Sequence, residues 1–577
     1  MLRKLPIPRN KGELTMAEKQ IMIIDGMPVE INGEKNLLEV IKKVGIEMPT
    51  FCYYSELSVY GACRMCMVEN DRGGFEAACS TPPRAGMNIK TNTQRLRKYR
   101  KNILELLLAN HCRDCTTCYK SNKCKLQDLA RRYKIEGVRF PNTNVTPRED
   151  VSSPCIVKDN SKCILCGDCV RMCNEIQNVG AIDFAFRGSK MEISTAFGKP
   201  MSESPCVGCG QCAAVCPTGA IVLHSEMEQV WKALESKDVK TTVQIAPAVR
   251  VAVAKEFGLP NGENVMGKIV TALRLIGFDE VYDTSFSADL TIMEETNEFM
   301  ERLEKGGEFP LITSCCPAWI QYAEKKHPEL IKNISTCRSP MQMMASVLKY
   351  QAKMKGEKTF HVAVMPCTAK KFEAKREEFT MDGNPNVDAV ITTQGLIRLI
   401  KEAGVMFDKL ESEAVDVPLG TISGAGVIFG ATGGVTEAVL RRISSTGSRS
   451  ELMSIANLGQ RGTEGIKEFE VPFGDKALKV VVASGLGNAE KVIKRMQAGE
   501  HFDFIEFMAC PNGCINGGGQ PFALSEEKAA RTKGLYDADK ALSIRRSQEN
   551  PLLDDLYKNV IKDKAHELLH VHYGKKH

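Results

Sequence analysis

The chain contains no run of about 18 apolar residues, the length that a membrane-spanning helix needs. Its first residues, MLRKLPIPRNKGELT, are basic but lack the apolar core of a secretory signal peptide. The net charge is only +6 over 577 residues, so the charge balance does not indicate a nucleic-acid partner. We therefore expect a soluble, cytoplasmic protein that binds neither a membrane nor nucleic acid.

A dinucleotide-binding fingerprint is also missing. The glycine-rich segments 423–430 (SGAGVIFG) and 485–490 (GLGNAE) do not match the pattern G-x-G-x-x-G. Any chemistry on a nicotinamide cofactor must then take place in a partner protein.

Cysteine is the residue that stands out, with 23 copies. A disulfide framework is typical of short secreted chains, and this chain is long and shows no secretion signal, so metal ligation is the better explanation. At the usual ~100–200 residues per domain, a chain of this length is expected to form about three to five domains.

The patterning predicts a multidomain α+β fold. Two short apolar runs surround Asp25-Gly26, a type I′ hairpin signal, and an amphipathic stretch follows, which predicts a small sheet with one crossing helix. After about residue 240, strand-like apolar runs alternate with amphipathic helical stretches, as in an α/β domain. Changes in the cysteine pattern and a polar linker at 141–150 divide the chain into four expected domains: 20–95, 96–145, 150–230 and 240–577.

The first cysteine set has the spacing C-x10-C-x2-C-x12-C. Its members are Cys52, Cys63, Cys66 and Cys79. Two thiolates from one tight loop and two flanking ones suit a 2Fe-2S cluster, and structural zinc is the alternative. The arrangement resembles plant-type ferredoxin with a spacing variant. This resemblance implies a β-grasp domain that holds one 2Fe-2S cluster.

The second set contains a histidine and has the spacing H-x3-C-x2-C-x5-C beside a predicted helix. Its members are His111, Cys115, Cys118 and Cys124. A lone histidine is usually just solvated, but here it stands at ligand spacing from three cysteines. We therefore expect a small helical domain in which these four residues hold a 4Fe-4S cluster.

Two copies of C-x2-C-x2-C-x3-C follow, 43 residues apart, as in a ferredoxin-like domain with two 4Fe-4S clusters. In such pairs the fourth cysteine of each motif ligates the cluster of the other motif. One expected set is Cys163, Cys166, Cys169 and Cys216. The other expected set is Cys206, Cys209, Cys212 and Cys173. Clusters in a row indicate electron transfer, because no single structural role needs so many.

Three cysteine-bearing loops remain in the last domain, and each follows a strand-like run. They offer a fifth set of four thiolates: Cys316, Cys367, Cys510 and Cys514. Ligands in α/β sheets tend to lie beyond the carboxyl ends of strands, which is where these loops begin. A nucleophilic role for Cys315 or Cys367 is the alternative, but no nearby histidine completes a catalytic pair.

The three loops, TSCCPAW (313–319), MPCTAKK (365–371) and MACPNGCINGGGQP (508–521), resemble the signature motifs of the iron-only, or FeFe, hydrogenases. The resemblance extends from about residue 20 to the end of the chain. It implies a catalytic H-cluster, a 4Fe-4S cube joined to a two-iron subsite that carries CO, cyanide and a dithiolate, and the reaction 2 H+ + 2 e− ⇌ H2. Cys316, Cys367 and Cys510 then match cube ligands, and Cys514 matches the bridging thiolate.

The same resemblance assigns roles to further residues. It implies a proton path through the residues Cys315, Glu295, Ser335 and Glu298, with Arg302 at its end. It implies that Lys370 holds a cyanide ligand and that four residues line the site: Pro247, Met365, Phe429 and Met508. Two positions depart from the family pattern, because Ala248 stands where serine is frequent and Met341 where glutamine is frequent.

The expected partners are ferredoxin or another electron carrier and the maturation proteins that supply the two-iron subsite. A basic cluster at 95–101 is either a solvated helix face or a docking patch for an acidic carrier. One alternative function is the catalytic subunit of a flavin- and NAD-linked, electron-bifurcating complex, since the N-terminal cluster pattern also resembles a subunit of respiratory complex I. A second is a non-catalytic protein of cluster assembly or sensing, which is expected to lose parts of the proton path.

The proposed imidazole ligand leads to a testable expectation. Replacing His111 by cysteine adds a negative charge to the cluster, so His111→Cys is expected to keep the cluster and lower its reduction potential. Redox titration followed by electron paramagnetic resonance measures this potential. An unchanged potential contradicts ligation by His111.

Overall fold

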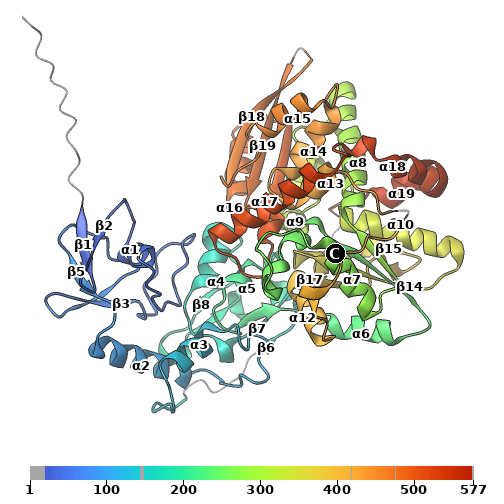
Figure 1. Ribbon diagram of the computed structural model, residues 1–577. Coiled ribbons are helices and arrows are strands. Elements are labelled where there is room, and N and C mark those ends of the chain that lie inside the picture. The colour runs from blue at the N-terminus through green and yellow to red at the C-terminus, as the bar shows by residue number, and fades with distance from the viewer. Residues whose placement is uncertain (1–19, 143–148, 418, 475, 575–577) are drawn as a thin grey trace, which may run out of the picture. The chain divides into compact units, whose positions relative to one another are not determined.

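The computed structural model describes residues 20–142, 149–417, 419–474 and 476–574, and the chain folds into two compact units (Figure 1). The first unit comprises residues 1–115 and 121–143, and the second comprises residues 116–120 and 144–577. Each unit is described by itself.

The described part of the first unit, residues 20–115 and 121–142, contains a five-stranded sheet and three helices. Its strands lie in the order β2-β1-β5-β3-β4. Their bounds are β1 Ile21–Ile24, β2 Met27–Glu30, β3 Met67–Asn70, β4 Phe75–Ala77 and β5 Asn88–Lys90. Strands β1 and β2 are antiparallel and are joined at Asp25 and Gly26, which both have positive φ angles (49° and 85°). The predicted hairpin is confirmed, and β1 also pairs in parallel with β5.

The helices in this described part are α1 Leu37–Lys43, α2 Gln94–Ala109 and α3 Lys125–Arg132. The side chain of Asn36 caps α1, and that of Thr93 caps α2. Most of the basic cluster at 95–101 lies on exposed positions of α2, but the interpretation of the whole cluster as surface was wrong for Arg100. That side chain is buried and donates to the carbonyl oxygens of Met65, Met67 and Thr91, so it holds α2 against the sheet.

The second unit begins with short elements that carry the cysteine repeat. The strands are β6 Glu149–Asp150, β7 Ile156–Asp159, β8 Asp183–Ala185, β9 Glu192–Ser194 and β10 Ile221–Leu223. The helices are α4 Asp168–Arg171 and α5 Gln211–Val215. The sheet order β10-β7-β6 and the hairpin of β8 with β9 frame these two helices. Gly167 and Gly210 precede the helices with positive φ angles, which lets each cysteine loop turn sharply.

Beyond this segment, the described residues of the second unit include two four-stranded sheets. One has the order β12-β11-β14-β17 and is entirely parallel. Its strands are β11 Lys240–Ile245, β12 Glu280–Asp283, β14 Thr359–Met365 and β17 Ala389–Thr392. The other has the order β13-β20-β19-β18, with only the edge strand β18 antiparallel. Its strands are β13 Leu311–Ile312, β18 Ile466–Phe473, β19 Lys476–Ser484 and β20 Phe504–Met508.

Helices pack around these sheets, as the alternating pattern predicts. Their bounds are α6 Met227–Glu235, α7 Met266–Ile276, α8 Ser285–Lys305, α9 Pro317–Lys326, α10 Pro340–Lys355, α11 Ala369–Glu373, α12 Thr393–Glu402, α13 Gly424–Val427, α14 Gly434–Ile443, α15 Arg449–Ala456 and α16 Leu486–Gln497. The C-terminal helices are α17 Ser525–Ala541, α18 Pro551–Asp555 and α19 Ala565–Leu569. A further pair of two-residue strands is β15 Thr380–Met381 with β16 Asn384–Pro385. Within the described residues, no helix combines the length and the apolar character needed to cross a membrane.

Parallel strands place their carboxyl ends at one edge of a sheet. In this unit β11 and β14 end at one such edge, and β13 and β20 end at the corresponding edge of the other sheet. The loops that follow three of these strands carry the cysteines at 315–316, 367 and 510–514. The topology therefore brings segments that are far apart in the sequence to a common region.

Candidate functional site

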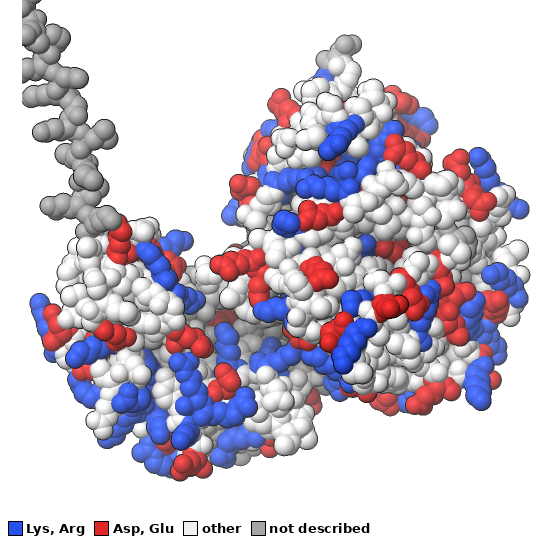
Figure 2. All heavy atoms as spheres, viewed as in Figure 1, with Lys and Arg blue, Asp and Glu red and all other residues white. Residues whose placement is uncertain are grey.

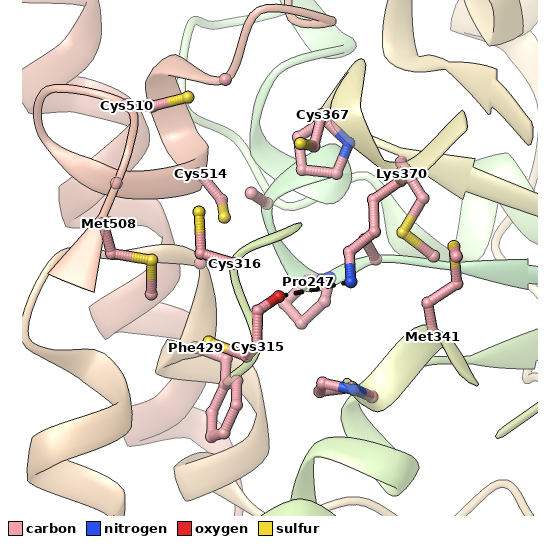
Figure 3. Close-up of a pocket in the computed structure, with 18 of the residues that line it drawn as sticks. Pro247, Cys315, Cys316, Met341, Cys367, Lys370, Phe429, Met508, Cys510 and Cys514 are labelled. Carbon is pink, nitrogen blue, oxygen red and sulfur yellow. Dashed lines mark hydrogen bonds between the residues drawn. The ribbon is translucent and has the colours of Figure 1, made fainter. Parts of the chain in front are cut away.

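The three cysteine loops line one cavity of about 80 Å³. Its wall includes all four thiols of the fifth set: Cys316, Cys367, Cys510 and Cys514. Figure 3 shows their side chains around a common space, reached from separate stretches of the chain. The prediction that the loops converge is confirmed, whereas the role of each thiol as a ligand remains a proposal.

The electrostatics of this cavity suit thiolate ligands for a cationic group. Burial raises the pKa of each of the four thiols, to about 12 for Cys367. A buried thiolate is stable only where a positive charge compensates it, and bound iron supplies such a charge. No three His, Cys, Asp or Glu side chains of the described residues converge closely enough to hold a single metal ion. The thiols instead surround a volume, so the donor set fits a multi-iron group.

Apolar side chains form most of the remaining wall. The residues expected at the site by resemblance, Pro247, Met365, Phe429 and Met508, all line the cavity. Both departures from the family pattern, Ala248 and Met341, line it as well. The wall at these two positions therefore offers a methyl group and a thioether in place of hydrogen-bonding side chains.

Lys370 brings a positive charge into this apolar cavity. Its Nζ lies 2.7 Å from Glu373 Oε2 and donates to the carbonyl oxygen of Cys315 at 3.3 Å (Figure 3). Burial alone lowers the pKa of this ammonium, but the Glu373 carboxylate outweighs it and the pKa of Lys370 is raised. The lysine thus stays charged. Glu373 was not identified from the sequence, although its position one helical turn after Lys370 was an available signal.

A buried acid lies behind the cavity. Glu295 on α8 is fully buried, and its Oε1 accepts from the backbone N–H of Ser314 at 3.4 Å. Burial raises the pKa of Glu295 to about 8, and the nearby Glu298 adds to this. At neutral pH the carboxyl group is therefore protonated. Burial and the Glu295 charge also raise the pKa of the Cys315 thiol, which lines the cavity.

The polar residues continue outward from Glu295 along α8. Ser335 interacts with the Glu295 carboxyl group and donates to Glu298 Oε2 at 2.8 Å. Glu298 Oε1 in turn lies 2.5 Å from Arg302 Nη2. Ser335 and Arg302 line a second cavity, which is open to solvent and measures about 670 Å³. The structure thus brings together the five residues of the expected proton path, from Cys315 to Arg302.

The repeat cysteines separate into two neighbouring groups. Cys163, Cys166, Cys169 and Cys216 line one cavity of about 20 Å³. The charges of Cys173 and Cys206 act on both Cys209 and Cys212, so these four thiols form the other group. Each group contains the last cysteine of the opposite motif. This geometry matches the expected exchange of ligands between the two motifs.

The second of these groups adjoins the main cavity. Gln211, next to Cys212, donates to the carbonyl oxygen of Asn516 at 2.9 Å and hydrogen-bonds to the Cys510 thiol. Thr368, next to Cys367, donates to the carbonyl oxygen of Gly208 at 2.5 Å. Neither contact was expected from the sequence, because each joins residues that are far apart along the chain. They form a short hydrogen-bonded connection between the two groups of thiols.

In the first unit the ferredoxin-type cysteines lie in contacting pairs. The backbone N–H of Cys63 donates to Cys52 Sγ at 3.3 Å, and the side chains of Cys66 and Cys79 hydrogen-bond to each other. Of the histidine-containing set, His111, Cys115 and Cys124 belong to the first unit and Cys118 to the second. His111 is buried, and its Nδ1 accepts from the backbone N–H of Arg113 at 3.0 Å.

Family models match five parts of the chain. Residues 239–518 match the iron-only hydrogenase large subunit, C-terminal domain, and 525–576 match the iron hydrogenase small subunit. Residues 20–94 match a 2Fe-2S cluster binding domain, and 162–220 match a 4Fe-4S dicluster domain. Residues 100–139 match the iron-sulfur binding region of NADH-ubiquinone oxidoreductase-G.

Similar proteins include two relatives over almost the whole chain. NADP-reducing hydrogenase subunit HndD of Solidesulfovibrio fructosivorans is 41% identical, over 96% of this chain and 98% of its own length. Iron hydrogenase 1 of Clostridium pasteurianum is 37% identical, over 96% of this chain and all of its own length. A solved structure of a variant of FeFe-hydrogenase HydA1 from Chlamydomonas reinhardtii is 38% identical, with a TM-score of 0.52 over 60% of this chain and 98% of that one.

The raised pKa of Glu295 predicts a spectroscopic signature. Wild-type protein is expected to show a protonated carboxyl band in the infrared that disappears as the pH rises through about 8. Because the folded pKa lies above the unfolded value of about 4.3, the native state holds an extra proton between these values, and this contribution to stability falls as the pH rises across that interval. Glu295→Gln should lack the band. A band that persists in this variant assigns the proton elsewhere.

Proposed function

The chain belongs to the iron-only, or FeFe, hydrogenase family, and from this premise we propose which of its residues carry the interconversion of protons, electrons and H2. The enzyme is an oxidoreductase that contains iron-sulfur clusters and an H-cluster. One observation supports the assignment most strongly: four thiols from three distant loops share an apolar cavity that the buried Lys370 and the Cys315 thiol also line, with the buried acid Glu295 behind it.

In our proposal Cys316, Cys367, Cys510 and Cys514 would hold the H-cluster, the first three as ligands of its cube and Cys514 as the thiolate shared with its two-iron part. The bound group supplies the redox-active iron at which protons and electrons combine. Lys370 presents a fixed ammonium to the anionic ligands of that group, with Glu373 keeping the lysine charged and oriented. Pro247, Met365, Phe429 and Met508 exclude water from the cavity.

The proton path uses groups that change protonation state in turn. Glu298 exchanges protons with solvent beside Arg302, and the Ser335 hydroxyl lies between the two carboxyl groups. Glu295 holds its proton at neutral pH and passes it to Cys315, whose thiol faces the cavity. Reversal of these steps carries protons outward during H2 oxidation. Each step moves one proton between two neighbouring groups.

Electrons reach the site through the other clusters. We assign one 2Fe-2S cluster to the first domain, a 4Fe-4S cluster with one histidine ligand to the second, and two 4Fe-4S clusters to the third. Cys173, Cys206, Cys209 and Cys212 would hold the cluster next to the H-cluster, because the charge of Cys510 acts on Cys209 and Gln211 bridges the two sites. The proposed domains keep the bounds 20–95, 96–145, 150–230 and 240–577.

Two kinds of electron partner are consistent with the charged surface of the first unit and with the proteins that this chain resembles. Lys and Arg side chains gather over the part of the first unit that contains α2 and α3, which suits a ferredoxin with an acidic surface (Figure 2). The match to HndD, named a subunit of an NADP-reducing hydrogenase, supports the alternative of partner subunits that bind flavin and nucleotide. Maturation proteins are required for the two-iron part. We place the enzyme in the cytoplasm, where reducing conditions keep thiols available.

Removal of the Cys315 thiol tests the proposed proton path. Cys315→Ala is expected to leave iron content unchanged and to lower H2 turnover at least about a hundredfold, because the last proton-transfer group is removed. Iron analysis and H2 evolution with a chemical reductant measure the two effects. Cys112→Ala, at a cysteine outside all the proposed ligand sets, serves as the matched control. Turnover near the wild-type rate in Cys315→Ala shows that protons take another path.

The electron partner is tested by comparing acceptors. With H2 as the reductant, the isolated chain is expected to reduce an acidic ferredoxin and not NAD+ or NADP+, since no nucleotide fingerprint is present. Spectrophotometric rates, before and after addition of any flavoprotein that co-purifies, decide between the two partners. If the isolated chain reduces NAD+ or NADP+ directly, the prediction that nicotinamide chemistry requires a partner protein is wrong.

A further inference from the structure

A histidine near the C-terminus lies beside the outer end of the proton path. The segment 569–571 pairs with 336–338 as a short antiparallel bridge between Cys337 and His570. The backbone N–H of Val571 donates to the carbonyl oxygen of Thr336, and that of Arg338 donates to the carbonyl oxygen of Leu569. This pairing fixes His570 next to Thr336.

Thr336 connects this histidine to Glu298. Its backbone N–H and its Oγ1 both donate to Glu298 Oε2, at 3.0 and 3.2 Å. The same Oγ1 lies 2.9 Å from His570 Nδ1. A hydroxyl group in contact with both an imidazole nitrogen and a carboxylate can accept a proton from one while it gives its own proton to the other.

The opposite edge of the imidazole faces an acid. His570 Nε2 lies 3.0 Å from Glu294 Oε2, and Tyr557 hydrogen-bonds to the other oxygen of Glu294. Burial raises the pKa of Glu294, but the hydrogen bonds from His570 and Tyr557 outweigh it and the pKa is lowered. Glu294 is therefore an anion beside the imidazole.

Other charged groups around this histidine are fewer and lie at its periphery. The ring of the exposed His566 stacks on His570 with 4.8 Å between centroids. Arg338 donates to the backbone carbonyl oxygen of His570, and Arg442 acts on Glu294 from a distance. The side chain of His570 itself is 12% exposed, so it lies at the boundary between solvent and the interior.

We propose that His570 and Thr336 form a proton relay between solvent and Glu298, in addition to the opening beside Arg302. The inference rests on the proton path proposed above. In the inward step the Nδ1–H bond of the imidazolium breaks and the proton moves to Thr336 Oγ1, while the original hydroxyl proton of Thr336 moves to Glu298 Oε2. Glu298 becomes neutral, His570 becomes a neutral imidazole that keeps Nε2–H on Glu294, and no electron is transferred.

A second route for protons is useful because the positive charge of Arg302 lies beside the first route, the opening near Ser335. In the cavity beside Ser335, an incoming proton meets the guanidinium of Arg302, which repels positive charge and pairs with Glu298 Oε1. The relay reaches Oε2 through Thr336, which also lines this cavity, and its proton comes from His570, which pairs with the anionic Glu294. Imidazole is also the side chain that exchanges protons most readily near neutral pH.

The experiment measures proton arrival at Glu298 without turnover. Full-length enzyme, free of H2 and electron donor, is exposed to a rapid pH jump, and the carboxyl band of Glu298 is followed in the infrared. The band is identified by its shift in Glu298→Asp. Removal of the relay by His570→Gln or Thr336→Val is expected to slow the appearance of the band at least about tenfold. Thr336→Ser, which keeps the hydroxyl, should restore the wild-type rate.

His501 provides the matched control. His501→Gln changes an exposed histidine that pairs with Asp503, outside the path, and should leave the rate unchanged. A wild-type rate in either His570→Gln or Thr336→Val overturns the relay. Because the measurement involves no H2 chemistry, this failure is distinct from a failure of the hydrogenase assignment, which the Cys315→Ala variant tests.

Discussion

Burial of four thiols in one apolar cavity is the constraint on which the rest of the structure depends. Cys316, Cys367, Cys510 and Cys514 all have raised thiol pKa values, so as thiolates they require positive charge beyond that of Lys370, which in our proposal bound iron supplies. Parallel strands of two sheets end at this cavity, which explains how loops so far apart in sequence meet. The surrounding Met and Phe side chains lower the local dielectric and strengthen every charge inside.

In our proposal, electrons and protons approach this cavity through different parts of the chain. The cysteine-repeat segment contacts the cavity loops through Gln211, beside Cys510, and through Gly208, which accepts from Thr368 beside Cys367. The proton path approaches from α8 and ends at Cys315. Glu295 remains protonated at neutral pH because it is buried, and this state prepares it as a donor. Because the two routes are separate, each can have its own environment. Electrons move between groups of sulfur ligands, and protons move along a row of acids and hydroxyls.

Much of this arrangement was predictable from the sequence, for physical reasons. Apolar runs such as FHVAVM and FIEFMA form buried strands, and the cysteine loops follow them, so their convergence could be expected. The resemblance to a family supplied the roles of Glu295, Ser335 and Glu298, which spacing alone did not. Contacts between distant segments were missed, as with Gln211 and His570, because no local pattern encodes them. Arg100 was misjudged since a charged residue on a helix is usually exposed, whereas here three carbonyl groups compensate its burial.

The central claim is that these four thiols hold iron. Anomalous diffraction at the iron absorption edge, measured on crystals of the full-length protein purified without oxygen, tests it most directly. The account predicts strong iron density that fills the cavity between Cys316, Cys367, Cys510 and Cys514 and extends past Cys514 toward Lys370. A cavity without iron density, or with a single peak at the zinc edge, contradicts it.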